Sequence, residues 1–234
     1  MPILAIDTAT LVSSVALATE GTLLAELTLE TKKNHSEQLM PNIEQLLNVA
    51  GVSQNQIKAV AVSIGPGSFT GLRIGLATAK ALAYAWQVPV VGVPTLEALA
   101  YGCCVPGAVL AATLDAQKGN MYLALYQGQG NTVAVMRQPH VVSLAEAIKE
   151  WQALDQPVVI LGEAIKLYNG KIPVSDKLMV AGPHLAMPRA ANVAYAGLEM
   201  LKTGISQDVM TLEPMYIRRS EAEELWSARH GGLK

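Results

Sequence analysis

Apolar residues along the chain form short continuous runs that alternate with longer stretches of helical periodicity. The run at 3–6 ends at Asp7 and a polar turn follows it, as expected for a buried strand that reaches the edge of a sheet. Residues 36–50 and 71–86 carry apolar side chains at helical spacing and predict two helices. Further strands are predicted at 14–18, 23–29, 57–64, 88–93, 109–114, 121–126 and 158–161, and further helices at 95–101, 144–154 and 189–203.

One pattern occurs twice, a strand that ends in an aspartate followed by a turn and a second strand. Asp7 occupies this position in the first copy and Asp115 in the second. Two such halves predict a duplicated α/β fold with a cleft between two lobes, the architecture of actin-like and sugar-kinase-like ATPases. The alternative is a plain α/β protein, because aspartate is favoured at strand ends for capping turns. We expect a first lobe over 1–105, a second over 106–219 and a loosely attached tail over 220–234.

Composition narrows the class of protein. Hydrophobic residues make up 51% of the chain but aromatic residues only 5%, so Ala, Val, Leu and Ile must fill the core. Charged residues are 15%, against roughly 25% in typical soluble proteins, which indicates a surface partly covered by another protein. The net charge of −2 argues against a stand-alone nucleic-acid binder. No secretion signal or long apolar span is evident and the two cysteines are adjacent, so we expect a cytoplasmic protein without membrane contact.

A glycine-rich segment at 65–71 lies between a predicted strand and a predicted helix, where backbone N–H groups can hold an anion. It is not a P-loop because no Lys follows, and not a dinucleotide fingerprint because Thr70 stands at the sixth position. Ser68 lacks the flanking glycines of a hydrolase nucleophile. An anion site and a tight turn capped by Ser68 or Thr70 both remain open. The candidates for contact with a nucleotide phosphate are Asp7, Thr8, Gly65, Gly67 and Ser68.

A metal site is not expected. The four histidines are scattered with no pair at helical spacing, and no Cys-x-x-Cys occurs.

The helix predicted from Gly71 carries a stripe of small residues, which continues through Gly75, Ala79 and Ala83. Such a stripe usually packs on the chain's own sheet, but this helix is apolar on other faces as well. Together with the helix at 36–50, it offers more apolar surface than one sheet face needs. We therefore predict a helical partner interface made by Leu39, Ile43, Leu46, Leu47, Leu72, Leu76 and Lys80.

Several segments in this order resemble one known family, TsaB (YeaZ). The most specific is 65–75 (GPGSFTGLRIG), and the resemblance spans almost the whole chain. The other segments that carry it are 6–10 (IDTAT), 35–41 (HSEQLMP), 93–97 (VPTLE), 115–118 (DAQK) before Tyr122, and 214–218 (PMYIR).

The resemblance implies the actin-like ATPase (ASKHA, ribonuclease H-like) fold and a role in making N6-threonylcarbamoyladenosine beside the tRNA anticodon. It implies that a catalytic paralogue, TsaD, transfers threonylcarbamoyl from threonylcarbamoyl-adenylate to the adenosine amine. TsaB pairs with TsaD through first-lobe helices, an ATPase named TsaE joins them, and tRNA is met only in the complex. The family also forms homodimers. No cofactor is implied for this chain itself, with ATP or ADP shared at an interface left open.

The paralogue carries two metal-binding histidines where this chain has Thr95 and Leu99. A Leu side chain cannot ligate a metal, so a non-catalytic, activating subunit is predicted rather than an enzyme. Two alternatives stay open. One is a cleft phosphotransferase or glycoprotease-like hydrolase that uses Asp7 and Asp115, and the other is a homodimeric nucleotide sensor.

Overall fold

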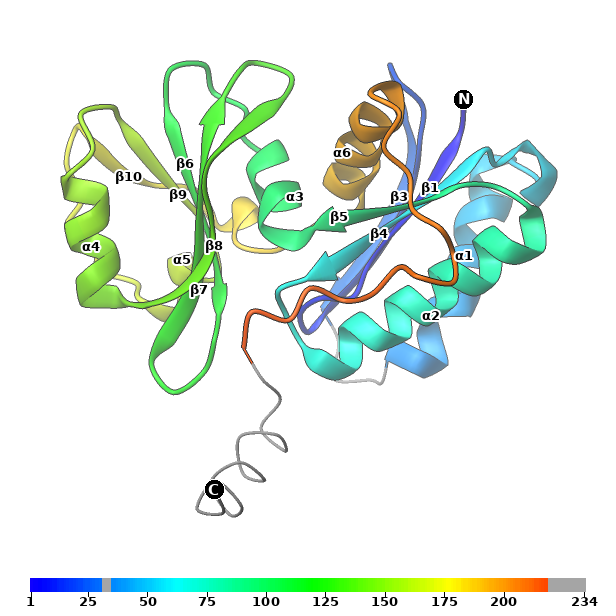
Figure 1. The fold of residues 1–234 in the computed structure, drawn as a ribbon, viewed down its shortest axis with the longest axis horizontal. Coiled ribbons are helices and arrows are strands. Elements are labelled where there is room, and N and C mark those ends of the chain that lie inside the picture. The colour runs from blue at the N-terminus through cyan, green and yellow to red at the C-terminus, as the bar shows by residue number, and fades with distance from the viewer. Residues whose placement is uncertain (31–34, 219–234) are drawn as a thin grey trace, which may run out of the picture.

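The computed structural model describes residues 1–30 and 35–218, and they form two five-stranded sheets side by side (Figure 1). The first sheet contains β1 (Ile3–Asp7), β2 (Val12–Ala18), β3 (Leu23–Glu30), β4 (Ala59–Gly65) and β5 (Val90–Pro94). The second contains β6 (Val109–Asp115), β7 (Asn120–Gly128), β8 (Val133–Ser143), β9 (Val158–Gly162) and β10 (Leu178–Val180). The helices are α1 (His35–Ala50), α2 (Phe69–Trp86), α3 (Thr95–Tyr101), α4 (Leu144–Gln152), α5 (Ala164–Leu167) and α6 (Ala190–Lys202).

The two sheets share one strand order, which confirms the predicted duplication. The first runs β3-β2-β1-β4-β5 and the second β8-β7-β6-β9-β10. In each, the first three strands are antiparallel and the last three are parallel. Asp7 and Asp115 end the equivalent central strands β1 and β6, so the sequence pattern correctly located the two turns.

Helix α2 begins where the sequence predicted a cap. The Ser68 hydroxyl accepts a hydrogen bond from the Gly71 N–H at 3.2 Å, which satisfies one of the free donors at the helix start. The stripe of small residues faces the chain's own sheet, because Gly71, Gly75, Ala79 and Ala83 are all buried. Helix α1 runs without interruption through Pro41.

The lobes exchange helices. Helices α1 and α2 cover one face of the first sheet, but α6, from the end of the chain, covers the other. Helix α3 follows the last strand of the first sheet yet packs on the core of the second, opposite α4 and α5. The sheets do divide between 94 and 109, but a second lobe made only of 106–219 does not describe the structure, because α6 belongs to the first core. The predicted tail, 220–234, lies outside the described residues.

Residues 207–218 follow α6 and form an extended segment, here called the C-terminal strap. Gln207 bridges to Val90 on β5, and the Leu212 side chain is buried in the first lobe. Figure 1 shows this orange segment passing α2 and continuing to the second lobe. The strap therefore covers the outer edge of the first sheet.

Within residues 1–30 and 35–218, no helix combines the length and the apolar character that a bilayer crossing requires.

Candidate functional site

Asp7 ends β1 as a buried carboxylate with internal partners. Its side chain accepts hydrogen bonds from the Ser63 hydroxyl on β4 and from the Ala9 N–H, the latter at 3.0 Å. Burial raises the pKa of Asp7, while the two hydrogen bonds and the charge of His35 act in the opposite direction. Asp7 is only 1% exposed, so its side chain links β1 to β4 and does not face solvent.

The turn after Asp7 packs directly on the glycine-rich segment. The Ser68 N–H donates to the Ala9 carbonyl at 2.6 Å, and the Thr8 hydroxyl donates to the Gly71 carbonyl at 2.8 Å. A Cβ added at Gly67 would overlap the Ala9 carbonyl oxygen, and one at Gly71 would overlap the Thr8 carbonyl oxygen. Gly67 and Gly71 are therefore required, because a residue without a Cβ lets the backbone of the turn after Asp7 contact the backbone of the glycine-rich segment.

Gly65 is held from two other directions. Its backbone φ of 118° lies in the region that favours glycine. Its N–H donates to the Thr95 hydroxyl at 3.1 Å, and a Cβ added there would lie 2.6 Å from the carbonyl oxygen of Met215 in the C-terminal strap.

The structure thus brings all five candidate phosphate contacts into one packed unit. The Ala9 carbonyl accepts from the Ser68 N–H, and the Thr8 carbonyl lies against Gly71, both at the start of α2, where an anion would need N–H donors. The segment forms a tight strand–helix turn capped by Ser68, and anion binding at this turn stays a prediction.

Asp115, at the equivalent turn of the second lobe, has partners of its own. Its carboxylate accepts from the Gln117 N–H at 2.8 Å, and its N–H donates to the Glu163 carboxylate at 2.7 Å. Burial, joined by the neighbouring charge of Asp115, raises the pKa of Glu163. Asp7 is thus buried within its lobe, whereas Asp115 is exposed and makes a local turn bond through one carboxylate oxygen.

The two positions compared with metal-binding histidines serve internal packing. The Thr95 hydroxyl is fully buried and accepts from Gly65, while the Leu99 side chain is 2% exposed in the core of the second lobe. Both side chains consequently hold α3 between the lobes.

Five of the predicted partner residues lie in the core of the first lobe and do not form an exposed surface in this chain. Their helical periodicity was read correctly, but the face that it identifies packs on the chain's own sheet. The five are Leu39, Ile43, Leu46, Leu72 and Leu76, with exposures of 1%, 1%, 3%, 1% and 5%. Leu47 is half-buried, and the Lys80 ammonium donates to the Met210 and Leu212 carbonyls of the C-terminal strap.

The outward faces of α1 and α2 carry other apolar side chains. Val49 is 78% exposed, Tyr84 74% and Met40 48%, and Ala77 and Ala81 of α2 are exposed as well. Met40 and Val49 lie on opposite flanks of α1, because nine residues span about two and a half turns. A partner that wraps around these two helices would meet this set, which the sequence analysis missed because periodicity does not tell which side of a helix faces the sheet.

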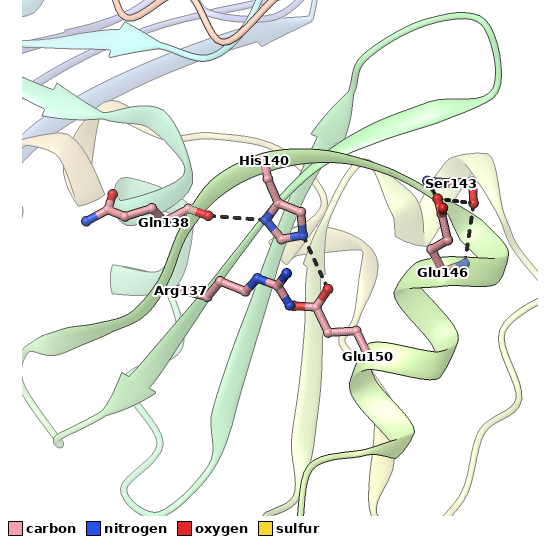
Figure 2. Close-up of polar contacts among 6 residues, drawn as sticks. All are labelled: Arg137, Gln138, His140, Ser143, Glu146 and Glu150. Carbon is pink, nitrogen blue, oxygen red and sulfur yellow. Dashed lines mark hydrogen bonds and ion pairs between the residues drawn. The ribbon is translucent and has the colours of Figure 1, made fainter.

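A polar cluster on the second lobe was also missed. Glu150 on α4 has an ion pair with Arg137 at 2.8 Å, and its other oxygen lies 3.2 Å from His140 Nε2 (Figure 2). His140 Nδ1 lies 3.2 Å from the Gln138 carbonyl. These contacts tie the edge strand β8 to α4, and so His140 has a structural partner.

Comparison with known proteins gives consistent matches over nearly the whole chain. A family model described as TsaD, tRNA N6-adenosine threonylcarbamoyltransferase, matches residues 22–226. The chain is 33% identical to the tRNA threonylcarbamoyladenosine biosynthesis protein TsaB of Bacillus subtilis, over 97% of this chain and 98% of that protein. It is 32% identical to the protein of the same name from Escherichia coli, over 95% of this chain and 96% of that protein.

Solved structures agree on the fold. A Pseudomonas aeruginosa structure named YeaZ is 27% identical, with a TM-score of 0.76 over 92% of this chain and 99% of that chain. A second structure from the same organism, described as similar to peptidase YEAZ, gives a TM-score of 0.80 over 93% and 99%. The fold is thus the two-lobed actin-like ATPase fold.

Proposed function

Because the chain belongs to the TsaB family, we propose that it is the non-catalytic, activating subunit of a tRNA threonylcarbamoyltransferase. The assembly moves a threonylcarbamoyl group from threonylcarbamoyl-adenylate to N6 of the tRNA adenosine next to the anticodon. The chain works there with TsaD, which carries the catalytic site, and with the ATPase TsaE. It meets tRNA only within this assembly, in the cytoplasm.

The observation that supports the proposal is the internal packing of the residues at the positions where a catalytic site would be expected. Leu99 is packed in a core and the Thr95 hydroxyl is bonded to the Gly65 N–H, so neither is available to a metal ion. Asp7 is buried against Ser63 rather than open to a substrate. These contacts favour a partner role over a cleft phosphotransferase or hydrolase.

We place the partner contact on the outward faces of α1 and α2, at Met40, Val49 and Tyr84. Exposed apolar side chains on two neighbouring helices are suited to a contact with another protein. The same surface would serve a homodimer when TsaD is absent. Arg substitutions at Leu46 or Leu76 cannot test this contact, because both side chains are in the core and the chain would unfold.

Reconstitution from purified subunits tests the activating role. Modification of tRNA should be low with TsaD and TsaE alone and should rise when this chain is added, while this chain alone should give none. Unchanged modification after omission of this chain would overturn the proposal.

A matched pair of variants tests the surface. Val49→Glu places a charge on α1, and Val174→Glu places the same charge at a position of similar exposure, 70% against 78%, on the second lobe. Val49→Glu should weaken binding to TsaD by roughly tenfold or more, because an unpaired charge at a dry contact is costly. Val174→Glu should bind as the parent chain does. Equal binding by both variants in titration calorimetry would place the contact elsewhere.

A further inference from the structure

The two lobes are joined by the chain at three places. Two lie next to the helices that the lobes exchange, since the chain crosses between β5 and α3 and again before α6, and these helices pack on each other. The third is the end of the C-terminal strap. In Figure 1 the strap reaches the second lobe below α3, whereas α6 lies above the end of the strap.

The strap is fixed to the first lobe by backbone contacts and by one aromatic stack. The Met215 N–H donates to the Ile64 carbonyl at 2.6 Å. The Tyr216 ring stacks on Phe69 of α2 with centroids 4.9 Å apart, and its hydroxyl accepts from Arg73 Nε at 3.1 Å. The Arg73 guanidinium lies 3.9 Å from the centre of the Phe69 ring. These three side chains hold the strap on the first turns of α2.

The next two residues of the strap contact the other lobe. Ile217 packs against the core of the second lobe, and Arg218 Nη1 donates to the Ala116 carbonyl at 2.8 Å. Ala116 lies in the turn after Asp115. Adjacent residues of one extended segment therefore attach to opposite lobes.

Another contact between the lobes is weaker. Lys166 and Glu30 form an ion pair at 3.3 Å, but their side chains are 47% and 54% exposed, so solvent and salt screen it. Compared with this ion pair, the strap is the better-packed connection between the lobes.

We infer that residues 214–218 form a releasable latch that fixes the angle between the lobes. The attachment is suited to opening, because Phe69 and Tyr216 are 36% and 43% exposed, and because the described part of the strap meets the second lobe through Ile217 and Arg218. When the latch is open, the lobes remain joined at α3 and α6 and turn about that contact. The inference concerns this chain alone and does not depend on the proposed function.

Distance measurement between two spin labels tests the latch. The labels are placed at the exposed positions Gln45→Cys on α1 and Gln152→Cys on α4, in a chain whose Cys103 and Cys104 are replaced by Ala. Tyr216→Ala frees the first-lobe end of the latch, and Arg218→Ala weakens its second-lobe end. Met210→Ala is the control, because it changes the same strap at a side chain that is 77% exposed.

Both latch variants should lengthen and broaden the distance between the labels, and Met210→Ala should leave it unchanged. Hydrogen exchange of the Met215 amide should become roughly tenfold faster in Tyr216→Ala, as expected for loss of a ring stack and one hydrogen bond. Tyr216→Phe, which keeps the ring, should fall between Tyr216→Ala and the parent.

Two outcomes would overturn the inference. One is an unchanged distance in both latch variants. The other is a change in Tyr216→Ala with none in Arg218→Ala, since the strap would then be a cover of the first lobe only. Circular dichroism of each variant confirms that the measured chains are folded.

Discussion

At the scale of single residues, Asp7 shows how a carboxylate at the end of a central strand becomes part of the core. The Ser63 hydroxyl and the Ala9 N–H satisfy its oxygens, and burial raises its pKa. Two hydrogen bonds offset part of the cost of burying Asp7, but the charged carboxylate still loses its hydration. Asp7 is therefore expected to stabilise the turn by its hydrogen bonds and to weaken the fold by its charge.

Replacing Asp7 separates these effects. A carboxyl whose folded pKa is raised binds its proton more tightly in the folded state, so its contribution to stability is lost as pH rises from its ordinary value of 3.8 through the raised value. Asp7→Asn accepts from the Ala9 N–H through its amide oxygen and donates its amide N–H to Ser63 Oγ, without charge. Its free energy of unfolding at pH 7 should therefore equal or exceed that of the parent. Asp7→Ala should lose about 1–3 kcal/mol.

Urea unfolding at pH 4 and pH 7 measures both variants. The difference between the two pH values should shrink in Asp7→Asn but not vanish, because burial also raises the pKa values of Glu97 and Glu163. A stability loss in Asp7→Asn as large as that in Asp7→Ala would show that the charge itself stabilises the turn.

Gly71 carries a second residue-scale prediction. A Cβ at this position overlaps the Thr8 carbonyl, so Gly71→Ala forces the turn away from α2. Overpacking costs about 1–3 kcal/mol, which exceeds the gain of up to ~1 kcal/mol from placing alanine in a helix. Gly21→Ala is the matched control because its Cβ meets nothing within 4 Å. Thermal unfolding should show a lower Tm for Gly71→Ala only, and an equal Tm for both would contradict the close contact.

At the scale of elements, the edge strands differ in how they are protected. The C-terminal strap covers β5, and β10 is only three residues long. Strand β8 is eleven residues long, but its pairing with β7 is irregular on both sides of Leu125 and Pro139 interrupts its donors. A bulged edge strand that contains proline resists pairing with other chains. The contacts to α4 then keep this irregular strand in place.

Glu150→Ala should therefore loosen β8. Its side chain is 13% exposed and holds both Arg137 and His140, whose own exposures of 55% and 27% allow them to rehydrate after the change. A loss of about 1 kcal/mol is expected, with faster hydrogen exchange confined to β8 and α4. Glu44→Ala, at an exposed position on α1, is the control. Exchange that stays slow in β8 would show that the cluster does not hold the strand.

The sequence alone predicted most elements but not their assignment to surfaces. Strands rich in β-branched residues and the Ser68 cap were found where they lie, whereas β8 was missed because Arg137, Gln138 and Pro139 break its alternation. The apolar faces of α1 and α2 were identified, but they were assigned to a partner interface and not to the chain's own core. Periodicity defines an apolar face without saying what covers it, and the Asp7–Ser63 contact joins residues too far apart in sequence for a local pattern to reveal.

At the scale of the whole molecule, the exchange of α3 and α6 makes the lobes interdependent. The α6 start is capped by first-lobe residues, since the Ala190 N–H donates to Ser14 Oγ at 2.9 Å and the Ala191 N–H to Glu26 at 3.1 Å. Glu26 also pairs with Arg189. Without α6, one face of the first sheet, rich in Ala and Val, is open to water.

A fragment of residues 1–105 should therefore fail to fold alone. Its circular dichroism should lack a cooperative thermal transition, and addition of a peptide covering 189–218 should restore one. A cooperative transition in the fragment by itself would show that α6 is dispensable for the first lobe. A peptide with Gly197→Leu is the control, because Gly197 packs closely on Ala61 of β4 and a larger side chain cannot fit.

The exchanged helix also sets an order of events on the ribosome. The strands of the first sheet emerge early, but the helix that seals their inner face is translated only after all strands of the second sheet. Until then an apolar surface of small side chains is exposed in the nascent chain, and chaperones can bind it. The lobe that is made first is thus completed only after the second sheet has been synthesised.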